Sequence, residues 1–269
     1  LICAAGRASC ARAGRPGCVI AALSGAADSV LLLRALRTLR EDTPFELRVV
    51  HVNHGLRENA ALDETFCREL CAKWHIPLAV FHVQVDSHGS TEDAARRARY
   101  AAFEQAMPAG QAAVLALAHH MDDQAETVLM HLIYGSGMAG LSGMRELSGA
   151  FWRPLLSVRR TQIRDALTAL HQPWREDESN QDTAYTRNHL RARALPALEQ
   201  ANAPAVPAIC RAADILRQED GLLNHLAQDA LSGACGRGMH RFILLTALTD
   251  QEPAMQRRML RVYAAEAGL

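Results

Sequence analysis

Short apolar runs of strand length alternate with longer stretches of helical spacing in the first part of the chain. The runs Cys18–Leu23 and Leu47–Asn53 are rich in aliphatic and β-branched residues, and apolar side chains recur every three positions from Val30 to Leu39 between them. This order predicts a strand, a helix and a second strand. Such a succession is typical of a parallel β-α-β unit.

The same alternation continues along the chain. Helical spacing over residues 62–74 leads into an apolar run at residues 78–85, and helical spacing over residues 91–106 leads into another at residues 112–120. Four strands, each followed by a helical pattern, predict an α/β fold in which a parallel sheet carries helices on both faces.

Polar loops follow three of these predicted strands, at Ser24–Ser29, His51–Arg57 and Ala118–Asp123. Ligands of open parallel sheets bind beyond the carboxyl ends of the strands. We therefore expect the three loops to meet at one edge of the sheet.

The pattern changes after about Leu156. Residues 159–172 have the spacing of a helix, residues 174–188 are polar, and a helical tail runs from His189 with a break at residues 201–207. We expect an extension of uncertain order at residues 1–17, an α/β domain over residues 18–203 and a smaller helical region over residues 204–269, with the boundary near Pro204.

Composition narrows the class of protein. The chain is 49% hydrophobic and 22% charged, which is typical of a globular protein, and no stretch approaches the roughly 20 apolar residues that span a bilayer. Seven scattered cysteines without a CxxC pair suit a reducing cytoplasm, and Cys67 and Cys71 have the spacing of packed helix residues. A net charge of zero argues against indiscriminate coating of nucleic acid, although residues 153–193 carry eight arginines against five carboxylates.

The loop SGAADS, Ser24–Ser29, has the make-up of a phosphate site. Backbone amides at the start of the following helix, with the hydroxyls of Ser24 and Ser29, suit phosphate oxygens, and Asp28 suits Mg²⁺. The alternative is an ordinary helix cap without a ligand. The single lysine of the chain is Lys73, so this is not a Walker-type loop, and a P-loop kinase or GTPase is excluded.

Two further stretches carry candidate chemistry. Asp123 and Glu126 share a helix face in AHHMDDQAET, where they complement the helix dipole or hold a cationic substrate or a metal. A zinc site that includes His119 and His120 is disfavoured because adjacent strand residues point to opposite faces. Arg99, in the helix with the sequence ARRARY, either faces solvent or pairs with a phosphate or carboxylate.

SGAADS resembles the SGGxDS signature of the PP-loop ATP pyrophosphatases. Within that superfamily the chain resembles the tRNA(Ile)-lysidine synthetase family, in order from about Val19 to its end. The motifs that carry this resemblance are HVNHGLR, ARRARY, AHHMDDQAET, GSGMAGLSGM, RPLL and WREDESNQDTAYTRNHLR.

The resemblance implies an ATP-dependent ligase that adenylates the wobble cytidine of an isoleucine tRNA with a CAU anticodon and then attaches free L-lysine to form lysidine. It implies a PP-loop catalytic domain at residues 18–203, with Asp28 on Mg²⁺, Asp123 and Glu126 on the amino groups of lysine, and Arg99 on its carboxylate or on the activated intermediate. The residues implied to hold the ATP phosphates are Ser24, Gly25, Ala26, Ala27, Asp28 and Ser29, and those implied to contact tRNA or phosphate are Arg187, Asn188 and Arg191.

Two departures from the family pattern are visible. Ala26 stands where the pattern has glycine, and alanine in a left-handed conformation costs on the order of 1 kcal/mol, so we expect weaker ATP binding. The chain also stops at Leu269, so we expect the helical region at residues 204–269 to lack the further tRNA-binding domain of many members. Another PP-loop enzyme such as a tRNA thiolase, or a weakened tRNA-binding protein, remains an alternative. The tail leaves the oligomeric state open, a dimer included.

Overall fold

The structure is a computed structural model, and it describes residues 14, 16–53, 55, 60–83, 91–108, 113–176, 186–237 and 241–267. The chain divides into two compact units. The first comprises residues 1–126 and 144–206, and the second comprises residues 127–143 and 207–269. The extension expected at residues 1–17 lies almost entirely outside the described residues. The domain boundary near Pro204 stays a prediction.

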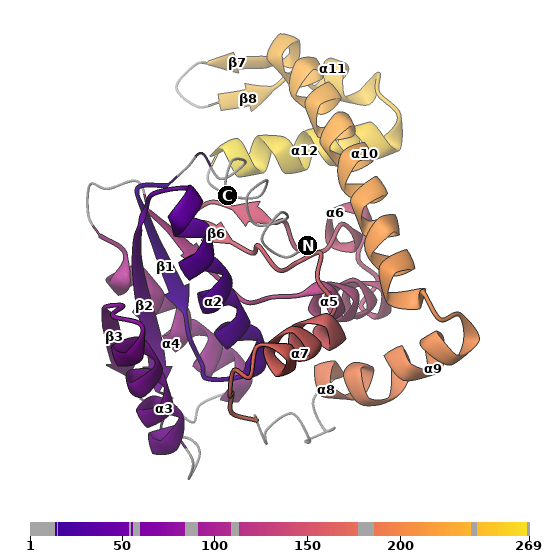
Figure 1. Ribbon diagram of the computed structural model, residues 1–269. Coiled ribbons are helices and arrows are strands. Elements are labelled where there is room, and N and C mark those ends of the chain that lie inside the picture. Colours follow the sequence, from indigo (N-terminus) through magenta and orange to yellow (C-terminus); the bar gives the residue numbers. More distant parts are fainter. Residues whose placement is uncertain are drawn as a thin grey trace. The chain divides into compact units, whose positions relative to one another are not determined.

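The first unit is built on a six-stranded sheet with the order β3-β2-β1-β4-β6-β5 (Figure 1). Its strands are β1 (Cys18–Ala22), β2 (Glu46–Asn53), β3 (Leu78–His82), β4 (Ala113–Ala116), β5 (Leu147–Ser148) and β6 (Phe151–Trp152). All neighbouring strands pair in parallel except β5, which is antiparallel to β6. The predicted α/β fold and its four parallel strands are confirmed, whereas β5 and β6 were not predicted.

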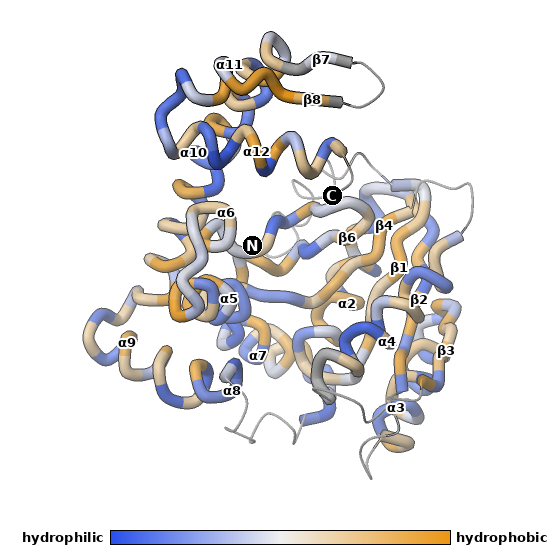
Figure 2. Tube along the Cα trace, turned by 180° about the vertical axis from the view of Figure 1, so that it is seen from behind, coloured by the Kyte–Doolittle hydropathy of each residue, from blue (hydrophilic) through white to orange (hydrophobic). Residues whose placement is uncertain are grey.

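Helices cover both faces of the sheet, as expected. The elements are α2 (Ala27–Asp42), α3 (Ala60–Lys73), α4 (Thr91–Ala106), α5 (Met121–Ile133) and α7 (Arg160–Ala169). Helices α2, α3 and α7 share one core with β1, which includes the fully buried Leu32 and Ile163, and α4 places Phe103 against Ile20 on the other face. The hydropathy of the strands agrees with this burial, because β1, β2 and β4 are largely hydrophobic in Figure 2.

The strand order creates a switch point between β1 and β4. From β1 the chain passes through α2 to β2 on one side, whereas α4 delivers β4 to the other side. The loops after β1 and β4 therefore diverge from adjacent strands at the same edge, which is where open α/β sheets bind ligands. The sheet brings Ser24–Ser29 and Ala118–Asp123 together there.

Residues 186–201, near the end of the first unit, are helical. A short α8 (Thr186–His189) continues through a π-helical turn, η2 (Leu190–Ala194), into α9 (Leu195–Ala201). The chain leaves helical structure at Asn202 and resumes it at Ala205, so a break is present but is shorter than the predicted range of residues 201–207.

The second unit contains α6 (Met138–Leu141), α10 (Ala205–Ala234), α11 (Leu245–Thr249), α12 (Pro253–Ala267) and a hairpin of β7 (Cys235–Arg237) and β8 (Arg241–Ile243). The hairpin was not predicted. Ala227, Leu231 and Met259 form part of the core of this unit. Across the described part of the chain, no helix has the length and apolar character that a membrane span requires.

Candidate active site

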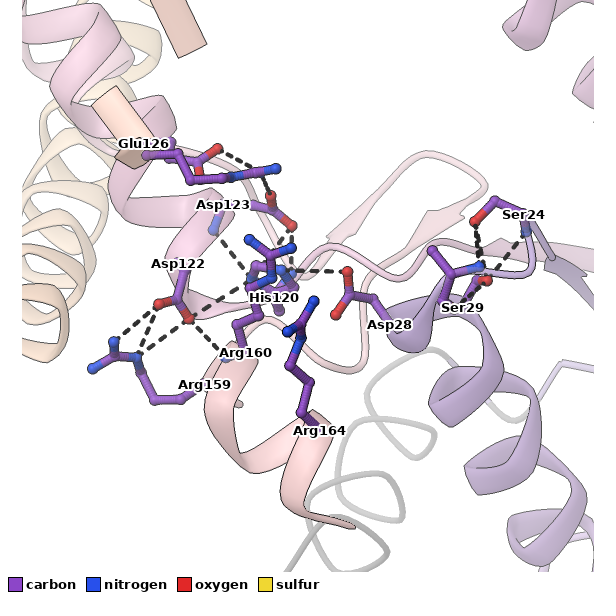
Figure 3. A network of polar contacts seen from close by, with 12 residues as sticks. Ser24, Asp28, Ser29, His120, Asp122, Asp123, Glu126, Arg159, Arg160 and Arg164 are labelled. Atoms are coloured by element: carbon purple, nitrogen blue, oxygen red, sulfur yellow. Dashed lines mark hydrogen bonds and ion pairs between the residues drawn. The ribbon is translucent and has the colours of Figure 1, made fainter. Parts of the chain in front are cut away.

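The phosphate loop links β1 to α2 through residues 23–26 and is held by its own hydroxyls. The hydroxyl of Ser29 donates to the Ala26 carbonyl at 2.9 Å and accepts from the Ser24 amide at 3.1 Å. The Ala26 amide in turn donates to the Ser24 hydroxyl at 3.3 Å. Ala26 is the N-cap of α2 and gives it no side-chain cap hydrogen bond, so no N-cap side chain covers the positive dipole end of this helix (Figure 3).

The strain expected at Ala26 is absent. Its φ of −68° and ψ of 157° lie in the extended region, so the left-handed penalty does not apply and that part of the expectation was wrong. The left-handed position of the loop is Gly25, with a φ of +91°. A Cβ on Gly25 would also lie 3.4 Å from a ring carbon of Phe66.

Arg175 fixes this loop from a distance in sequence. Its amide donates to the Gly25 carbonyl at 2.9 Å, and its guanidinium Nε donates to Asp63 on α3 at 2.8 Å. The residue lies in the WREDES motif, but its part in shaping the loop was not foreseen because a backbone pairing between distant segments leaves no local pattern.

These contacts predict opposite outcomes for two neighbouring substitutions. Gly25→Ala forces a side chain into the left-handed region and is expected to lower the free energy of unfolding by about 1–2 kcal/mol. Ala26→Gly relieves no backbone strain, so the ATP KM is expected to stay within about twofold of the wild-type value. Chemical denaturation and steady-state kinetics on the two variants check both statements. A large fall of the ATP KM in Ala26→Gly would show that the methyl group obstructs ATP.

His120 joins the phosphate loop to the start of α5. Its Nδ1 accepts from the Asp123 amide at 3.3 Å, which places the proton of the neutral ring on Nε2, 3.6 Å from Oδ2 of Asp28. Burial alone would lower the pKa of His120, but the carboxylates of Asp28, Asp123 and Asp122 raise it above its usual value. The buried imidazole is therefore a positive or proton-donating group that lies between Asp28 of the phosphate loop and Asp122 and Asp123 at the start of α5 (Figure 3).

Asp122 anchors α7 beside this histidine. Its carboxylate accepts from the Arg159 guanidinium at 2.9 Å and from the Arg160 amide at 2.8 Å, and Arg159 also pairs with Glu199 at 2.9 Å. Neither Arg159 nor Glu199 was singled out from the sequence. The start of α7 is thereby fixed next to the loop that follows β4.

The acids expected to hold lysine pair with the arginines expected to contact tRNA or phosphate. Glu126 is fully buried, and its carboxylate accepts from Arg191 at 2.6 Å and from Arg187 at 2.8 Å. Asp123 accepts from Arg191 at 3.1 Å. Burial would raise the pKa of Asp123, but His120 and Arg187 hold it below its usual value, so the group is a carboxylate at neutral pH.

Two other expected site residues are more exposed than the buried Glu126. Arg99 is exposed on α4, and Asn188 is half-buried on α8. Of the loop after β2, His54 and residues 56–57 lie outside the described residues. His51, at the end of β2, donates from Nδ1 to the Leu23 carbonyl at 2.8 Å and so braces the start of the phosphate loop.

His119 and His120 follow β4, which ends at Ala116, so the alternation expected for strand residues does not apply to them. Burial lowers the pKa of His119 to about 4, opposed by Asp123 and assisted by Arg153, Arg187 and Arg96. Its Nδ1 is buried without a hydrogen-bond partner among the described residues. The ring is therefore neutral at physiological pH.

This neutral histidine gives the folded state a pH dependence. Between about pH 6.5 and about pH 4 the unfolded chain takes up a proton on His119 and the folded chain does not, so this residue makes the free energy of unfolding fall as the pH falls through that window. His119→Asn is expected to remove this part of the slope. An NMR titration of the wild-type ring should show a midpoint near 4, and a midpoint above 6 would contradict the assignment.

The comparisons with known proteins agree with this geometry. A family model described as PP-loop domain matches residues 9–198. The chain is similar to the tRNA(Ile)-lysidine synthase of Enterobacter sp. (strain 638), with 39% identity over 92% of this chain and 60% of that protein, and to that of Shigella flexneri, with 39% identity over 90% of this chain and 57% of that protein. The chain thus spans about three-fifths of the length of these curated relatives.

Among solved structures, the fold is similar to that of the U34-tRNA thiolase NcsA from Methanococcus maripaludis. The TM-score is 0.63, with 18% sequence identity, 80% of this chain covered and 78% of that one. At this identity the likeness concerns the fold alone. The family model over residues 9–198 shows that the chain belongs to the PP-loop family.

Proposed function

We propose that this protein is a tRNA(Ile)-lysidine synthase. It uses ATP to adenylate the 2-oxo oxygen of the wobble cytidine in the CAU anticodon of isoleucine tRNA, and free L-lysine then displaces AMP at the same carbon. The observation that carries the proposal is the link through His120, which joins a phosphate loop with an uncapped helix start to a buried acidic pair. The names of the similar curated proteins support it.

The phosphates of ATP bind at the start of α2 in this account. The amides of residues 25–29 and the hydroxyls of Ser24 and Ser29 surround them, and the positive end of the helix dipole favours their charge. For the Ala26 amide and the Ser29 hydroxyl to donate to phosphate, their hydrogen bonds to the Ser24 hydroxyl and the Ala26 carbonyl must break. Asp28 has a buried Oδ1 without a partner among the described residues, an acceptor that fits a hard cation, so Asp28 is the residue that would hold Mg²⁺. Bound Mg²⁺ neutralises charge on the phosphate oxygens.

Lysine binds on the acidic side of the site. Asp123 and Glu126 hold its amino groups and Arg99 takes its carboxylate. The amine that attacks must first lose a proton, because the usual pKa of lysine is about 10.4, and Asp123 is the carboxylate that orients or deprotonates it. For lysine to reach Glu126, the guanidinium groups of Arg187 and Arg191 must leave it. These arginines, with Asn188, then contact phosphates of the tRNA.

Sulfur transfer is less well supported. Cys67 and Cys71 are fully buried in the core below the phosphate loop, and burial raises the pKa of the Cys71 thiol to about 11, with a larger rise at Cys67. A thiol with so high a pKa is a poor nucleophile at neutral pH. A weakened tRNA-binding protein is also less well supported, since Ala26 sits in an unstrained conformation.

Labelled lysine tests the proposal. The purified chain is incubated with ATP, Mg²⁺, labelled lysine and a transcript of isoleucine tRNA with a CAU anticodon, and the label on RNA is counted. We expect label on this transcript and none on a matched transcript whose wobble cytidine is replaced by uridine. Sulfur incorporation, or tRNA binding without pyrophosphate release, would instead support the alternatives.

A further inference from the structure

Two arginines of α7 extend toward the phosphate site. Arg160 and Arg164 lie one helical turn apart, and Figure 3 shows both side chains pointing from α7 toward Asp28 and His120. We propose that Arg160 and Arg164 bind the pyrophosphate portion of ATP and stabilise pyrophosphate as it leaves. This inference rests on the proposed function and names two residues for its first step.

The fold fixes the direction of these side chains. Ile163 and Leu167 of α7 are completely buried in the core that α7 shares with α2. Asp122 holds the first turn of α7 through the Arg160 amide at 2.8 Å. Because residues four apart lie above one another on a helix, the two arginines project from one side of a firmly held helix.

Both side chains keep N–H donors that have no partner among the described residues. Among the described residues, the Arg160 guanidinium has no hydrogen-bond or ion-pair partner, and Nε of Arg164 is buried without one. The Nη2 of Arg164 donates to Glu176 at 2.8 Å, but that pair is largely exposed and contributes little to stability. A buried N–H group without an acceptor is unfavourable in a folded protein. An oxyanion beside Asp28 would satisfy it.

The chemistry of adenylation calls for cations at this place. When the cytidine oxygen forms its bond to the α-phosphorus of ATP, the bond from that phosphorus to the bridging oxygen breaks, and the electron pair stays on the departing pyrophosphate. Charge therefore grows on the pyrophosphate oxygens, and fixed positive groups lower the barrier. Many phosphate loops use a lysine, but the single lysine here, Lys73, ends α3. Guanidinium groups fit phosphate oxygens in a two-pronged fashion.

Comparing the binding of inorganic pyrophosphate with that of AMP distinguishes specific loss of the pyrophosphate contacts from general disruption of the site. In the double variant Arg160→Ala/Arg164→Ala we expect the Kd for pyrophosphate, measured by isothermal titration with Mg²⁺, to rise about 10- to 100-fold, because charged hydrogen bonds are lost. The Kd for AMP should change less than about twofold, because AMP lacks these phosphates. The double lysine variant should recover part of the pyrophosphate affinity.

Arg97→Ala provides a control for the loss of positive charge, since Arg97 is exposed on α4 and its replacement removes one of the two charges that the double variant loses. It should leave both affinities unchanged. Unchanged pyrophosphate affinity in the double alanine variant, or equal weakening of AMP and pyrophosphate, would overturn the inference while leaving the proposed function intact. A wild-type protein that binds ATP but transfers no lysine would instead refute the proposed function.

Discussion

Asp28→Asn is expected to slow tRNA-dependent pyrophosphate release by about 10²- to 10³-fold. Asparagine keeps the size of the side chain but removes the charge that faces His120 at 3.6 Å. It also replaces one carboxylate oxygen by an amide nitrogen, so the group proposed to hold Mg²⁺ becomes a neutral and weaker ligand. Release of pyrophosphate from ATP is measured with and without tRNA. The loss should appear in kcat as well as in the KM for ATP, since charge on the phosphates grows during the reaction.

Asp42→Asn is the matched control for this substitution. Asp42 is exposed at the opposite end of the same helix, α2. Its substitution therefore makes the same chemical change away from the phosphate loop. We expect wild-type rates for this variant. Equal rates for Asp28→Asn and the wild type would contradict the placement of the ATP phosphates at the start of α2.

Glu126→Gln is expected to lower the free energy of unfolding by about 3 kcal/mol. The Glu126 side chain is 0% exposed, whereas Arg187 and Arg191 keep 27% and 22% of their side-chain area exposed, so removing the carboxylate leaves two partly buried cations near each other. Removing one partner of a buried ion pair is more harmful than removing the whole pair. Chemical denaturation followed by circular dichroism measures the change.

Glu199→Gln is a suitable comparison because it also removes a carboxylate paired with an arginine. Glu199 is 32% exposed beside Arg159, and the expected loss is below about 1 kcal/mol. A stability of Glu126→Gln equal to that of the wild type would mean that the buried cluster is not held as described. Lysine transfer should also fall in Glu126→Gln and remain normal in Glu199→Gln.

The elements that the sequence predicts are those with long apolar patterns. β1 to β4 and α2 to α4 were foreseen because each has apolar residues at strand or helix spacing, most clearly in β1, α2 and β2, where aliphatic side chains are buried. β6 has only Phe151 and Trp152, too short for any alternation, and its pairing with β4 depends on residues far along the chain. The hairpin of β7 and β8 is equally short.

In the candidate site, too, local motifs were predicted and contacts between distant residues were not. The loop at Ser24–Ser29 and the acids Asp123 and Glu126 were foreseen from local motifs, and the parallel sheet explains why they converge. The arginine pairs of Glu126 join residues 61 and 65 positions apart, which no local pattern indicates. The sequence suggested strain at Ala26, but the backbone places the left-handed conformation one residue earlier, at Gly25.

The measurement that tests the central claim most directly follows the AMP group of ATP. The protein is incubated with ATP labelled in its α-phosphate, Mg²⁺ and the CAU-anticodon transcript in the absence of lysine, and the RNA is isolated under mild conditions. The account predicts label on the RNA that requires the wobble cytidine and is released as AMP when lysine is added. No label on the transcript, together with label attached to lysine in a parallel reaction that contains lysine but no RNA, would contradict it.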